Sequence, residues 1–555
     1  MGDKGNNQCP ILNSQFSILN SQFSILNSQF SILNSQFSIL NAQCPMPNAL
    51  NIMYLTQNSV QQLPTFRESD HGDNPRGAFR LKLPIARESK GSYYTQPLPG
   101  CPRMPPSLQL RQYQREAIAS WFTNNGRGTL KMATGSGKTI TALAIACELY
   151  QQINLQVLLV VCPYRHLVTQ WARECEKFNL QPILAFENLR TWQSQLSTQI
   201  YNLSSGSQRF VTVITTNSTL IGDGFQSQLK YFPAKTLIIG DEAHNLGAPK
   251  LEESLPRSVG LRLALSATPE RYFDDFGTQS LFDYFGLVLQ PEFTLKDAIA
   301  QGALVHYLYY PVLVELTEAE SIAYLKLTKR IGRSLLYRDR ENGGNFEDNE
   351  DLKPLLMQRA RLIGAAENKL TALHELMATR RDTTHTLFYC SDGSQDAVHR
   401  SSLRQLKAVA KILGVDLGYK VSTYTAQTSL QEREILRRQF ESGELQGLVA
   451  IRCLDEGVDI PAIQTAVILS SSGNPRQFIQ RRGRVLRPHP GKERATIFDM
   501  IVLPPDLDRE TIEVERNLLK KELRRFVEFA DLADNAGVAR MKLLDLQKRY
   551  GLLDI

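Results

Sequence analysis

The stretch TLIIGDEAHNLG, residues 236–247, decides how this chain is interpreted. Its apolar first half is typical of a buried strand, and Asp241, Glu242 and His244 follow directly. Burying two carboxylates and an imidazole without partners costs free energy. The stretch therefore predicts a strand that leaves the core at a point where it meets a charged group.

Further apolar runs stand on both sides of this stretch, and helical patterns alternate with them from about Pro106 onward. The runs are TLKMA (129–133), VLLVV (157–161), VTVIT (211–215) and RLALS (262–266). Such alternation predicts a parallel sheet with helices on both faces. Ligands of such sheets bind at the carboxyl ends of the strands, so the loops that follow strands are the candidate sites.

One of these loops is MATGSGKT, residues 132–139, which opens a helical pattern. Gly135 and Gly137 allow the backbone N–H groups to face a phosphate, Lys138 reaches the terminal phosphates, and the Thr139 hydroxyl suits Mg²⁺. Met132 stands where the usual first glycine of this pattern would be. The alternative is a glycine-rich turn with an incidental lysine. The strand before, the helix after and the intact GKT favour the phosphate loop.

A phosphate loop explains the carboxylates at the end of the stretch at 236–247. Asp241 is expected to hold Mg²⁺ through water, and Glu242 to orient and deprotonate an attacking water. Taken alone, the pair has another interpretation, in which an acidic strand end caps the next helix. Beside the GKT loop, a magnesium and nucleotide site is the better prediction.

DEAH at 241–244, with MATGSGKT before it and SAT at 266–268 after it, resembles a superfamily 2 helicase or translocase of the DEAH-box kind. The resemblance covers Leu108 to Pro488. It implies ATP and Mg²⁺ as cofactors and a role for His244 at the catalytic site. In LRQYQ (110–114), Gln114 would read the adenine, and the nucleotide-binding loop would comprise Thr134, Gly135, Ser136, Gly137, Lys138 and Thr139. VVCPYRHLVTQW (160–171) and VITTNSTL (213–220) stand in the place of the family's DNA-backbone loops. LALSATPER (263–271) resembles the motif that couples the ATP site to the nucleic-acid site.

The second half of the chain carries matching segments. TLFYCSDG (386–393) has the pattern of a buried strand that runs into a polar loop. VAIRCLDEGVDIP (449–461) resembles motif V, which implies Gly457 and Asp459 near the ribose. QFIQRRGRVLRP (477–488) resembles motif VI, with Gln480 at the γ-phosphate and Arg484 and Arg487 as arginine fingers.

The arginines of motif VI stand on a separate lobe, so they stabilise transition-state charge only when the lobes close. Taken alone, the arginine cluster has the alternative interpretation of a basic surface stripe. The resemblance implies an α/β fold with two tandem RecA-like domains, parallel sheets, an ATP site at their interface and a helical C-terminal extension.

The choice between DNA and RNA depends on small differences in these motifs. RNA-remodelling DEAD-box proteins typically have DEAD and HRxGRxGR, and RNA-processing DEAH helicases tend to keep a glycine where Leu486 stands. The pattern is more similar to restriction- and repair-type DNA helicases, including the helicase-like components of phosphorothioation-linked restriction systems. DNA is therefore the expected partner. The alternatives are an RNA helicase or a nucleotide-operated DNA-binding switch that does not unwind.

Composition narrows the class of protein without naming a function. A hydrophobic content of 42% with 21% charged residues is typical of a globular protein, and the net charge of +7 is compatible with a nucleic-acid partner. No apolar run reaches membrane-spanning length, and the eight cysteines form no CxxC pairs, so a cytoplasmic protein without a membrane or zinc site is expected. No nuclease signature is apparent, which implies a separate nuclease or restriction or repair subunit as partner.

The N-terminal segment does not have the pattern of a domain. ILNSQFS occurs four times in succession, starting at Ile11, Ile18, Ile25 and Ile32. A coiled coil is disfavoured because no charges flank a seam. The heptanucleotide ATTCTCA read repeatedly encodes ILNSQFS, and AATGCCC encodes NAQCPMP at Asn41–Pro47. We interpret the segment as disordered or as translated repeat DNA, upstream of a true start at Met53 or Met104.

These observations together predict the organisation of the chain. The expected parts are a low-complexity segment at 1–53, a linker or extension at 54–105, a first RecA-like domain at 106–290, a second at 291–505 and a helical tail at 506–555. The polar loop at 341–351 is expected to be disordered rather than a functional insertion. In the tail, Glu515–Ala536 has an amphipathic helical pattern, which predicts docking on the second lobe or, alternatively, partner binding.

Overall fold

The computed structural model describes residues 98–271, 274–339, 352–390, 405–425, 427–451, 460–470, 475–506 and 512–554. These residues all belong to one compact unit, Pro75–Ile555. The repeat segment at 1–53, the loop predicted at 341–351, and Gly457 and Asp459 lie outside the described residues.

The first half of the described chain forms a six-stranded parallel sheet in the order β1-β6-β5-β2-β4-β3. Its strands are β1 (Arg127–Lys131), β2 (Val157–Cys162), β3 (Pro182–Ala185), β4 (Val211–Thr216), β5 (Thr236–Asp241) and β6 (Leu261–Ser266). Every residue of β2, β4, β5 and β6 is buried, as expected where helices cover both faces of a parallel sheet. The register pairs Lys131 with Ser266 and Asp241 with Leu265, so the carboxyl ends of β1, β5 and β6 lie together.

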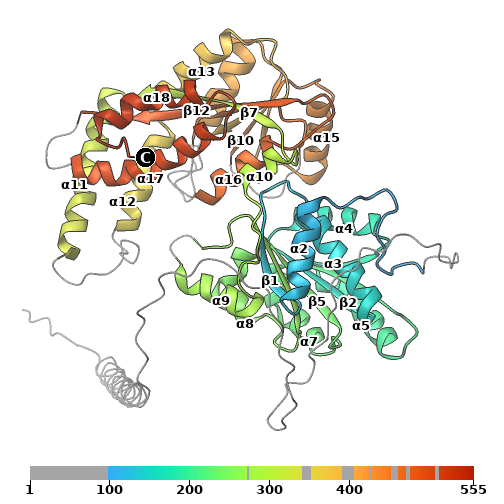
Figure 1. Ribbon diagram of the computed structural model, residues 1–555. Coiled ribbons are helices and arrows are strands. Elements are labelled where there is room, and N and C mark those ends of the chain that lie inside the picture. The colour runs from blue at the N-terminus through green and yellow to red at the C-terminus, as the bar shows by residue number, and fades with distance from the viewer. Residues whose placement is uncertain are drawn as a thin grey trace, which may run out of the picture. The chain divides into compact units, whose positions relative to one another are not determined.

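Helices connect and cover these strands (Figure 1). They are α2 (Gln112–Thr123), α3 (Lys138–Ile153), α4 (Arg165–Lys177), α5 (Leu189–Ser204), α6 (Asn217–Ile221), α7 (Asp223–Leu229), the 3₁₀ turn η1 (Ala243–Gly247), α8 (Pro249–Glu253), α9 (Asp275–Phe285) and α10 (Leu295–Ala300). The amphipathic helix α4 buries Leu167, Val168, Trp171 and Cys175. These buried side chains repeat at helical spacing and fix which face of α4 packs against the sheet.

The chain after α9 also pairs with the first sheet. Leu289 N–H donates to the Thr129 carbonyl at 2.9 Å, and Phe293 N–H donates to the Lys131 carbonyl at 3.1 Å. The Asn179 side-chain amide donates to the carbonyls of Leu98 and Cys101, which precede α2 in the chain. The segment after α9 therefore pairs with β1 up to the start of the loop that follows it.

The second half forms another six-stranded parallel sheet, in the order β7-β12-β11-β8-β10-β9. Its strands are β7 (His306–Glu315), β8 (Thr386–Cys390), β9 (Val421–Tyr424), β10 (Gly447–Ile451), β11 (Thr465–Ile468) and β12 (Arg494–Leu503). Two parallel six-stranded sheets in tandem confirm the predicted α/β fold with two RecA-like domains.

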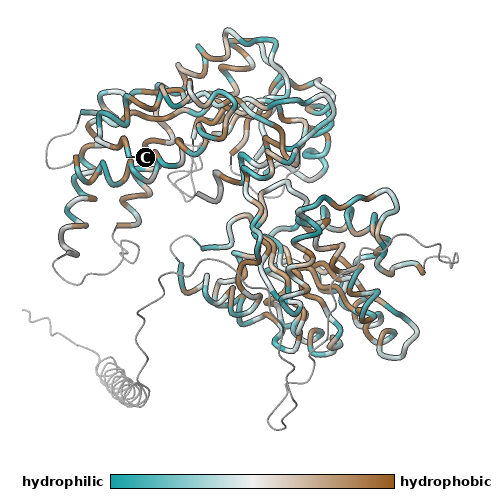
Figure 2. Tube along the Cα trace, in the orientation of Figure 1, coloured by the Kyte–Doolittle hydropathy of each residue, from teal (hydrophilic) through white to brown (hydrophobic). Residues whose placement is uncertain are grey.

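The helices of the second half are α11 (Glu318–Asp339), α12 (Leu352–Gly364), α13 (Asn368–Ala378), the π-helix η2 (Ile412–Asp416), α15 (Leu430–Glu441), α16 (Pro475–Val485), α17 (Ile512–Asp531) and α18 (Ala536–Arg549). Figure 1 shows α11 and α12 side by side as a helical pair. Figure 2 shows the strands of both sheets as predominantly hydrophobic, with hydrophilic residues concentrated on helices and loops. No described helix has both the length and the apolar character that crossing a membrane requires.

The C-terminal helices dock on the second sheet. In α17, Leu519, Leu523 and Phe526 are buried, and the Tyr307 hydroxyl of β7 donates to the Phe529 carbonyl at 2.7 Å. A buried ion pair adds to this contact, because Arg359 of α12 lies 2.8 Å from Glu515 of α17. The predicted amphipathic tail is therefore part of the second lobe's core.

Candidate functional site

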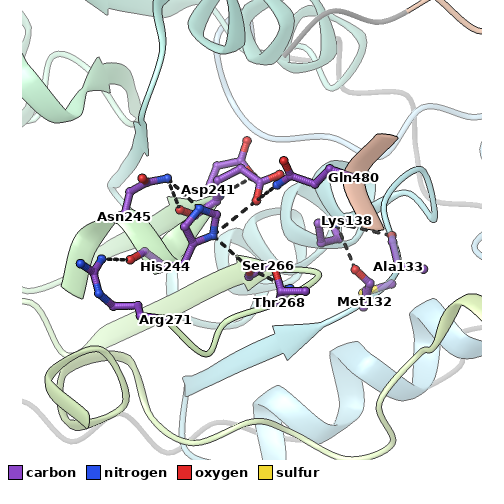
Figure 3. Close-up of polar contacts among 11 residues, drawn as sticks. Met132, Ala133, Lys138, Asp241, His244, Asn245, Ser266, Thr268, Arg271 and Gln480 are labelled. Atoms are coloured by element: carbon purple, nitrogen blue, oxygen red, sulfur yellow. Dashed lines mark hydrogen bonds and ion pairs between the residues drawn. The ribbon is translucent and has the colours of Figure 1, made fainter. Parts of the chain in front are cut away.

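The phosphate loop lies between β1 and α3. Gly135 and Gly137 have φ angles of 86° and 89°, in the region that favours glycine. A Cβ on Gly137 would come within 2.7 Å of Gln114 Nε2, so a larger residue there would also displace the Gln114 side chain. Lys138 Nζ donates to the carbonyls of Met132 at 3.1 Å and Ala133 at 3.4 Å, which holds the ammonium against the loop (Figure 3). Burial lowers the pKa of Lys138, and the charges of Glu242 and Asp241 oppose that shift.

Helix α2 packs its first turn against this loop. Gln114 Oε1 accepts from Arg111 N–H at 2.9 Å, and its amide donates to the Gly137 carbonyl at 3.4 Å. The Tyr113 hydroxyl donates to the Ser136 carbonyl at 2.6 Å, and its ring stacks on Phe293 with centroids 3.7 Å apart. Tyr113 thus supports the loop, a role that the match of LRQYQ (110–114) did not assign to it. The predicted role of Gln114 in reading adenine stays a prediction.

Asp241 ends β5 and is held by two donors. Its Oδ2 accepts from the Trp171 indole N–H at 2.8 Å, and its Oδ1 accepts from Glu242 N–H at 3.0 Å. Burial raises the pKa of Asp241, while the Trp171 hydrogen bond and the Lys138 charge lower it. Sequence reasoning missed Trp171 as a partner. The available signal was that a buried indole N–H usually needs an acceptor.

Glu242 adopts an unusual backbone conformation beside this carboxylate. Its φ and ψ of 43° and 52° place a non-glycine residue in the left-handed region. Such strain costs about 1–3 kcal/mol and concentrates at functional sites. Glu242 Oε2 accepts from the Gln480 amide at 3.1 Å and lies 3.7 Å from His244 Nδ1. The strained backbone therefore presents the carboxylate to a residue of the second sheet's domain.

His244 connects Glu242 to the end of β6. Asn245 Nδ2 donates to the Glu242 carbonyl at 3.0 Å and also lies 3.0 Å from His244 Nε2. Because an amide nitrogen can only donate, His244 Nε2 is the acceptor. The ring proton then sits on Nδ1, which faces Ser266 Oγ at 3.4 Å and the Glu242 carboxylate. Arg271 donates to the His244 carbonyl. These contacts join the end of β5 to the SAT segment, and Figure 3 shows them as one continuous group.

Helix α16 brings the predicted residues of the second lobe to the phosphate loop. Gln480 is 1% exposed and Arg484 is 7% exposed. A Cβ on Gly483 would lie 2.6 Å from Thr134 Cβ, and a Cβ on Gly135 would lie 3.2 Å from Arg487 Cγ. The charges of Arg487 and Arg484 also act on Lys138. Gln480, Arg484 and Arg487 therefore lie together with the loop and both carboxylates, whereas Gly457 and Asp459 lie outside the described residues.

The residues present fit a magnesium nucleotide. Thr134 Oγ1 and Thr268 Oγ1 are buried without a hydrogen-bond partner within the described residues, at the loop and at the SAT segment. Thr139 in the first turn of α3 and Asp241 offer hard oxygen ligands, which Mg²⁺ prefers. Among the described residues no three His, Cys, Asp or Glu side chains form a metal cluster. A cation that keeps waters and binds phosphates, as Mg²⁺ does, needs no such cluster.

Two family models match the chain, each on one of the two sheets. Residues 107–271 match "Type III restriction enzyme, res subunit", and residues 368–489 match "Helicase conserved C-terminal domain". The first contains the phosphate loop, both carboxylates and the SAT segment. The second contains Gln480, Arg484 and Arg487. The matches therefore divide the candidate site as the two sheets do.

Similar proteins include two curated relatives and one solved structure. The DNA 3'-5' translocase XPB2 of Sulfurisphaera tokodaii is 28% identical over 391 residues, which cover 70% of this chain and 80% of that protein. The DNA 3'-5' helicase XPB of Mycobacterium tuberculosis is 26% identical, with 72% of this chain and 62% of that protein covered. The ATP-dependent Type ISP restriction-modification enzyme LlaBIII bound to DNA is 20% identical, with a TM-score of 0.49 over 77% of this chain and 30% of that one.

The order of the two matched domains, the phosphate loop before the DEAH strand end, and motif VI on the second domain agree with one another. Over both of its domains, the chain is therefore similar to superfamily 2 helicases of the restriction and repair type.

Proposed function

We propose that this chain is an ATP-dependent DNA helicase or translocase, which couples ATP hydrolysis between its two lobes to movement on DNA. The contact of Gln480 with Glu242 carries the proposal. It joins the proposed water-activating carboxylate of one lobe to the arginine-bearing helix of the other. A change at the nucleotide is thereby transmitted to the relative position of the lobes.

Each residue of the site has a proposed task in hydrolysis. Bound ATP with Mg²⁺ supplies the phosphoanhydride bond that is cleaved. The backbone N–H groups of 134–139 and Lys138 bind the phosphates, and Thr139 and Asp241 hold the metal ion. Glu242 orients the attacking water and accepts its proton.

The second lobe completes this proposed site. Gln480 fixes the Glu242 carboxylate through its amide, and Arg484 and Arg487 stabilise the charge that develops in the transition state. Because Gln480 and Arg484 lie on α16 and Arg487 follows its end, hydrolysis requires the lobes to be in contact. We assign Gly457 and Asp459 to the ribose side of the same site from their motif alone.

The path from nucleotide to nucleic acid runs through two sets of contacts. The first is His244, Ser266 and Arg271, at the end of β5 and β6. The second is α4, where Trp171 donates to Asp241 and, at the N-terminal end, Tyr164 stacks on His166 with centroids 5.5 Å apart. Aromatic side chains and basic groups such as Arg165 suit a strand's bases and phosphates. We propose that the segments 160–171 and 213–220 contact the nucleic-acid strand.

The names of the relatives and the motif pattern support DNA over RNA as the polymer. We further propose a DEAH-box subtype, work in the cytoplasm, and a role in restriction or repair beside a separate nuclease subunit. A phosphorothioation-linked restriction system is one setting that fits a motor without a nuclease of its own. Degradation of DNA by the purified chain alone would contradict the separate nuclease.

The deciding experiment measures ATP hydrolysis with single-stranded DNA, duplex DNA, RNA or no polymer. Wild type is compared with Lys138→Ala and Glu242→Gln, which remove phosphate binding and water activation. We expect DNA to stimulate turnover and both substitutions to abolish it. Stimulation by RNA alone would overturn the DNA assignment and leave the site intact. Turnover that no polymer changes would indicate a nucleotide-operated switch.

A further inference from the structure

Lys492 lies in the turn between α16 and β12 and is 7% exposed. Its Nζ donates to the carbonyls of Val485 at 2.6 Å, Arg487 at 2.9 Å and Pro461 at 3.3 Å. An ammonium group carries three N–H donors, so all of them have an acceptor. The buried Lys492 Nζ therefore makes all three of these hydrogen bonds to backbone carbonyls.

These carbonyls belong to two functional segments. Val485 is the last residue of α16, where helix carbonyls lack intrahelical partners and carry partial negative charge. Arg487 follows it, and Pro461 closes the segment that resembles motif V. One ammonium group thus joins the end of motif V to the end of motif VI.

The backbone between the Val485 and Arg487 carbonyls is also held by the segment that leads into β7. Val305 N–H, just before β7, donates to the Leu486 carbonyl at 2.9 Å. The Arg487 side chain then passes over the phosphate loop, where a Cβ on Gly135 would meet its Cγ at 3.2 Å. A shift of the backbone at 485–487 would therefore move the guanidinium relative to the phosphates.

A lysine at this place is costly for folding. Burial lowers the pKa of Lys492 to about 7, and the positive charge of Arg487 acts in the same direction. A solvent-exposed lysine near a helix C-terminus stabilises the helix without this desolvation. A buried amino group whose contacts are all to backbone, at a site of arginines, indicates a role in geometry.

We propose that Lys492 is a positioning residue, which holds the end of α16 so that Arg487 meets the phosphates in the transition state. The inference rests on the proposed function of Arg487. Lys492 contacts no reacting atom, so its loss acts through the arginine. Ground-state nucleotide binding, which depends on 134–139, is then left nearly unchanged.

The test uses the full chain with Lys492→Met and measures two affinities. One is for a fluorescent ADP analogue, and the other is for ADP with aluminium fluoride, a mimic of the transferring phosphoryl group. We expect the affinity for the mimic to fall about 10- to 100-fold, with ADP affinity unchanged within about twofold. Equal losses for both ligands, or none for the mimic, would overturn the inference.

Two further variants separate positioning from folding. Lys369→Met removes another buried lysine of the same lobe, whose Nζ donates to the Leu469 carbonyl at 2.5 Å, and should leave the preference for the mimic intact. Lys492→Arg keeps a cation but cannot direct three donors from one atom, so it should reproduce part of the loss. The proposal would be contradicted if Lys492→Arg kept the full wild-type ratio of mimic affinity to ADP affinity while Lys369→Met lost it.

The Arg487→Ala background distinguishes this inference from the proposed function. If Lys492 acts through Arg487, then adding Lys492→Met to Arg487→Ala causes no further loss of affinity for the mimic. If the two substitutions instead lower the affinity for the mimic by the product of their separate effects, the positioning role of Lys492 is overturned while the role of Arg487 stands. A normal affinity in Arg487→Ala would overturn both the arginine assignment and the inference that depends on it.

Discussion

At the scale of single residues, the site depends on a few donors that hold carboxylates in place. Asp241 is buried and accepts from an indole, and Glu242 accepts from an amide of the other lobe. Each donor limits where a carboxylate oxygen can lie. Such outer contacts tune metal affinity and orientation.

Trp171→Phe keeps the ring but removes the N–H that donates to Asp241. We expect the Mg²⁺ concentration needed for half-maximal binding of a fluorescent nucleotide to rise about 10- to 100-fold. Nucleotide binding without Mg²⁺ should change little, because the phosphate loop is untouched. A magnesium titration followed by fluorescence measures both.

Trp192→Phe is the matched control for this substitution. Trp192 is buried in the same lobe at 2% exposure, and its Nε1 has no hydrogen-bond partner within the described chain. Its replacement should not change the magnesium requirement. An equal shift in both variants would mean that loosened packing, rather than the lost donor, causes the effect.

The site residues that the sequence predicted are those whose spacing along the chain determines where they lie in the fold. Lys138 follows a strand and a glycine-rich loop, and Asp241 with Glu242 ends another strand, so the topology of a parallel sheet brings them together. Trp171 and Lys492 had no such local signal. Their partners lie far along the chain or are backbone carbonyls, which a sequence pattern does not display.

At the scale of elements, α13 and β11 meet through a buried charge. Lys369, in the first turn of α13, donates to the Leu469 carbonyl just after β11 and is 1% exposed. Burial lowers the pKa of Lys369 to about 8 from 10.5, and the Asp499 charge opposes the shift. The folded state therefore binds fewer protons than the unfolded state between these two pH values.

The sign of the resulting pH dependence follows from proton linkage. Below pH 8 the lysine is charged in both states and the cost of burying it is fully present, and above pH 10.5 it is neutral in both. Stability of wild type should rise relative to Lys369→Met between these values, by up to about 1.4 kcal/mol per pH unit. Melting temperatures of both proteins from pH 7.5 to 10.5 measure this. A constant difference between them would show that Lys369 is not desolvated as described.

The strands that could be predicted from the sequence are those buried on both faces, because such strands are continuously apolar. The strands β2, β4, β5 and β6 correspond to apolar runs that are visible without a structure. Pairing with the first sheet by residues 287–293 was not predicted, because two isolated bridges leave no periodic pattern. Docking of α17 was expected from its apolar stripe, but its buried ion pair with α12 was not.

At the scale of the whole molecule, the proposed hydrolysis depends on how closely α16 approaches the phosphate loop. A Cβ on Gly483 would lie 2.6 Å from Thr134 Cβ and 3.0 Å from the Thr134 carbonyl oxygen, so a side chain there forces the lobes apart. Inside a helix, however, alanine is more stable than glycine by about 0.5–1 kcal/mol. The same substitution should therefore stabilise the helix and disturb the contact between lobes.

Gly483→Ala thus separates folding from activity. We expect the melting temperature to stay level or rise, while polymer-stimulated ATP hydrolysis falls about 100-fold, since small misplacements of catalytic groups are costly. Gly537→Ala in α18 is the control, because no heavy atom lies within 4 Å of its added Cβ, and its activity should match wild type. Normal hydrolysis in Gly483→Ala would show that turnover proceeds with α16 held further from Thr134. The contact of Gln480 with Glu242 would then no longer support hydrolysis between the lobes.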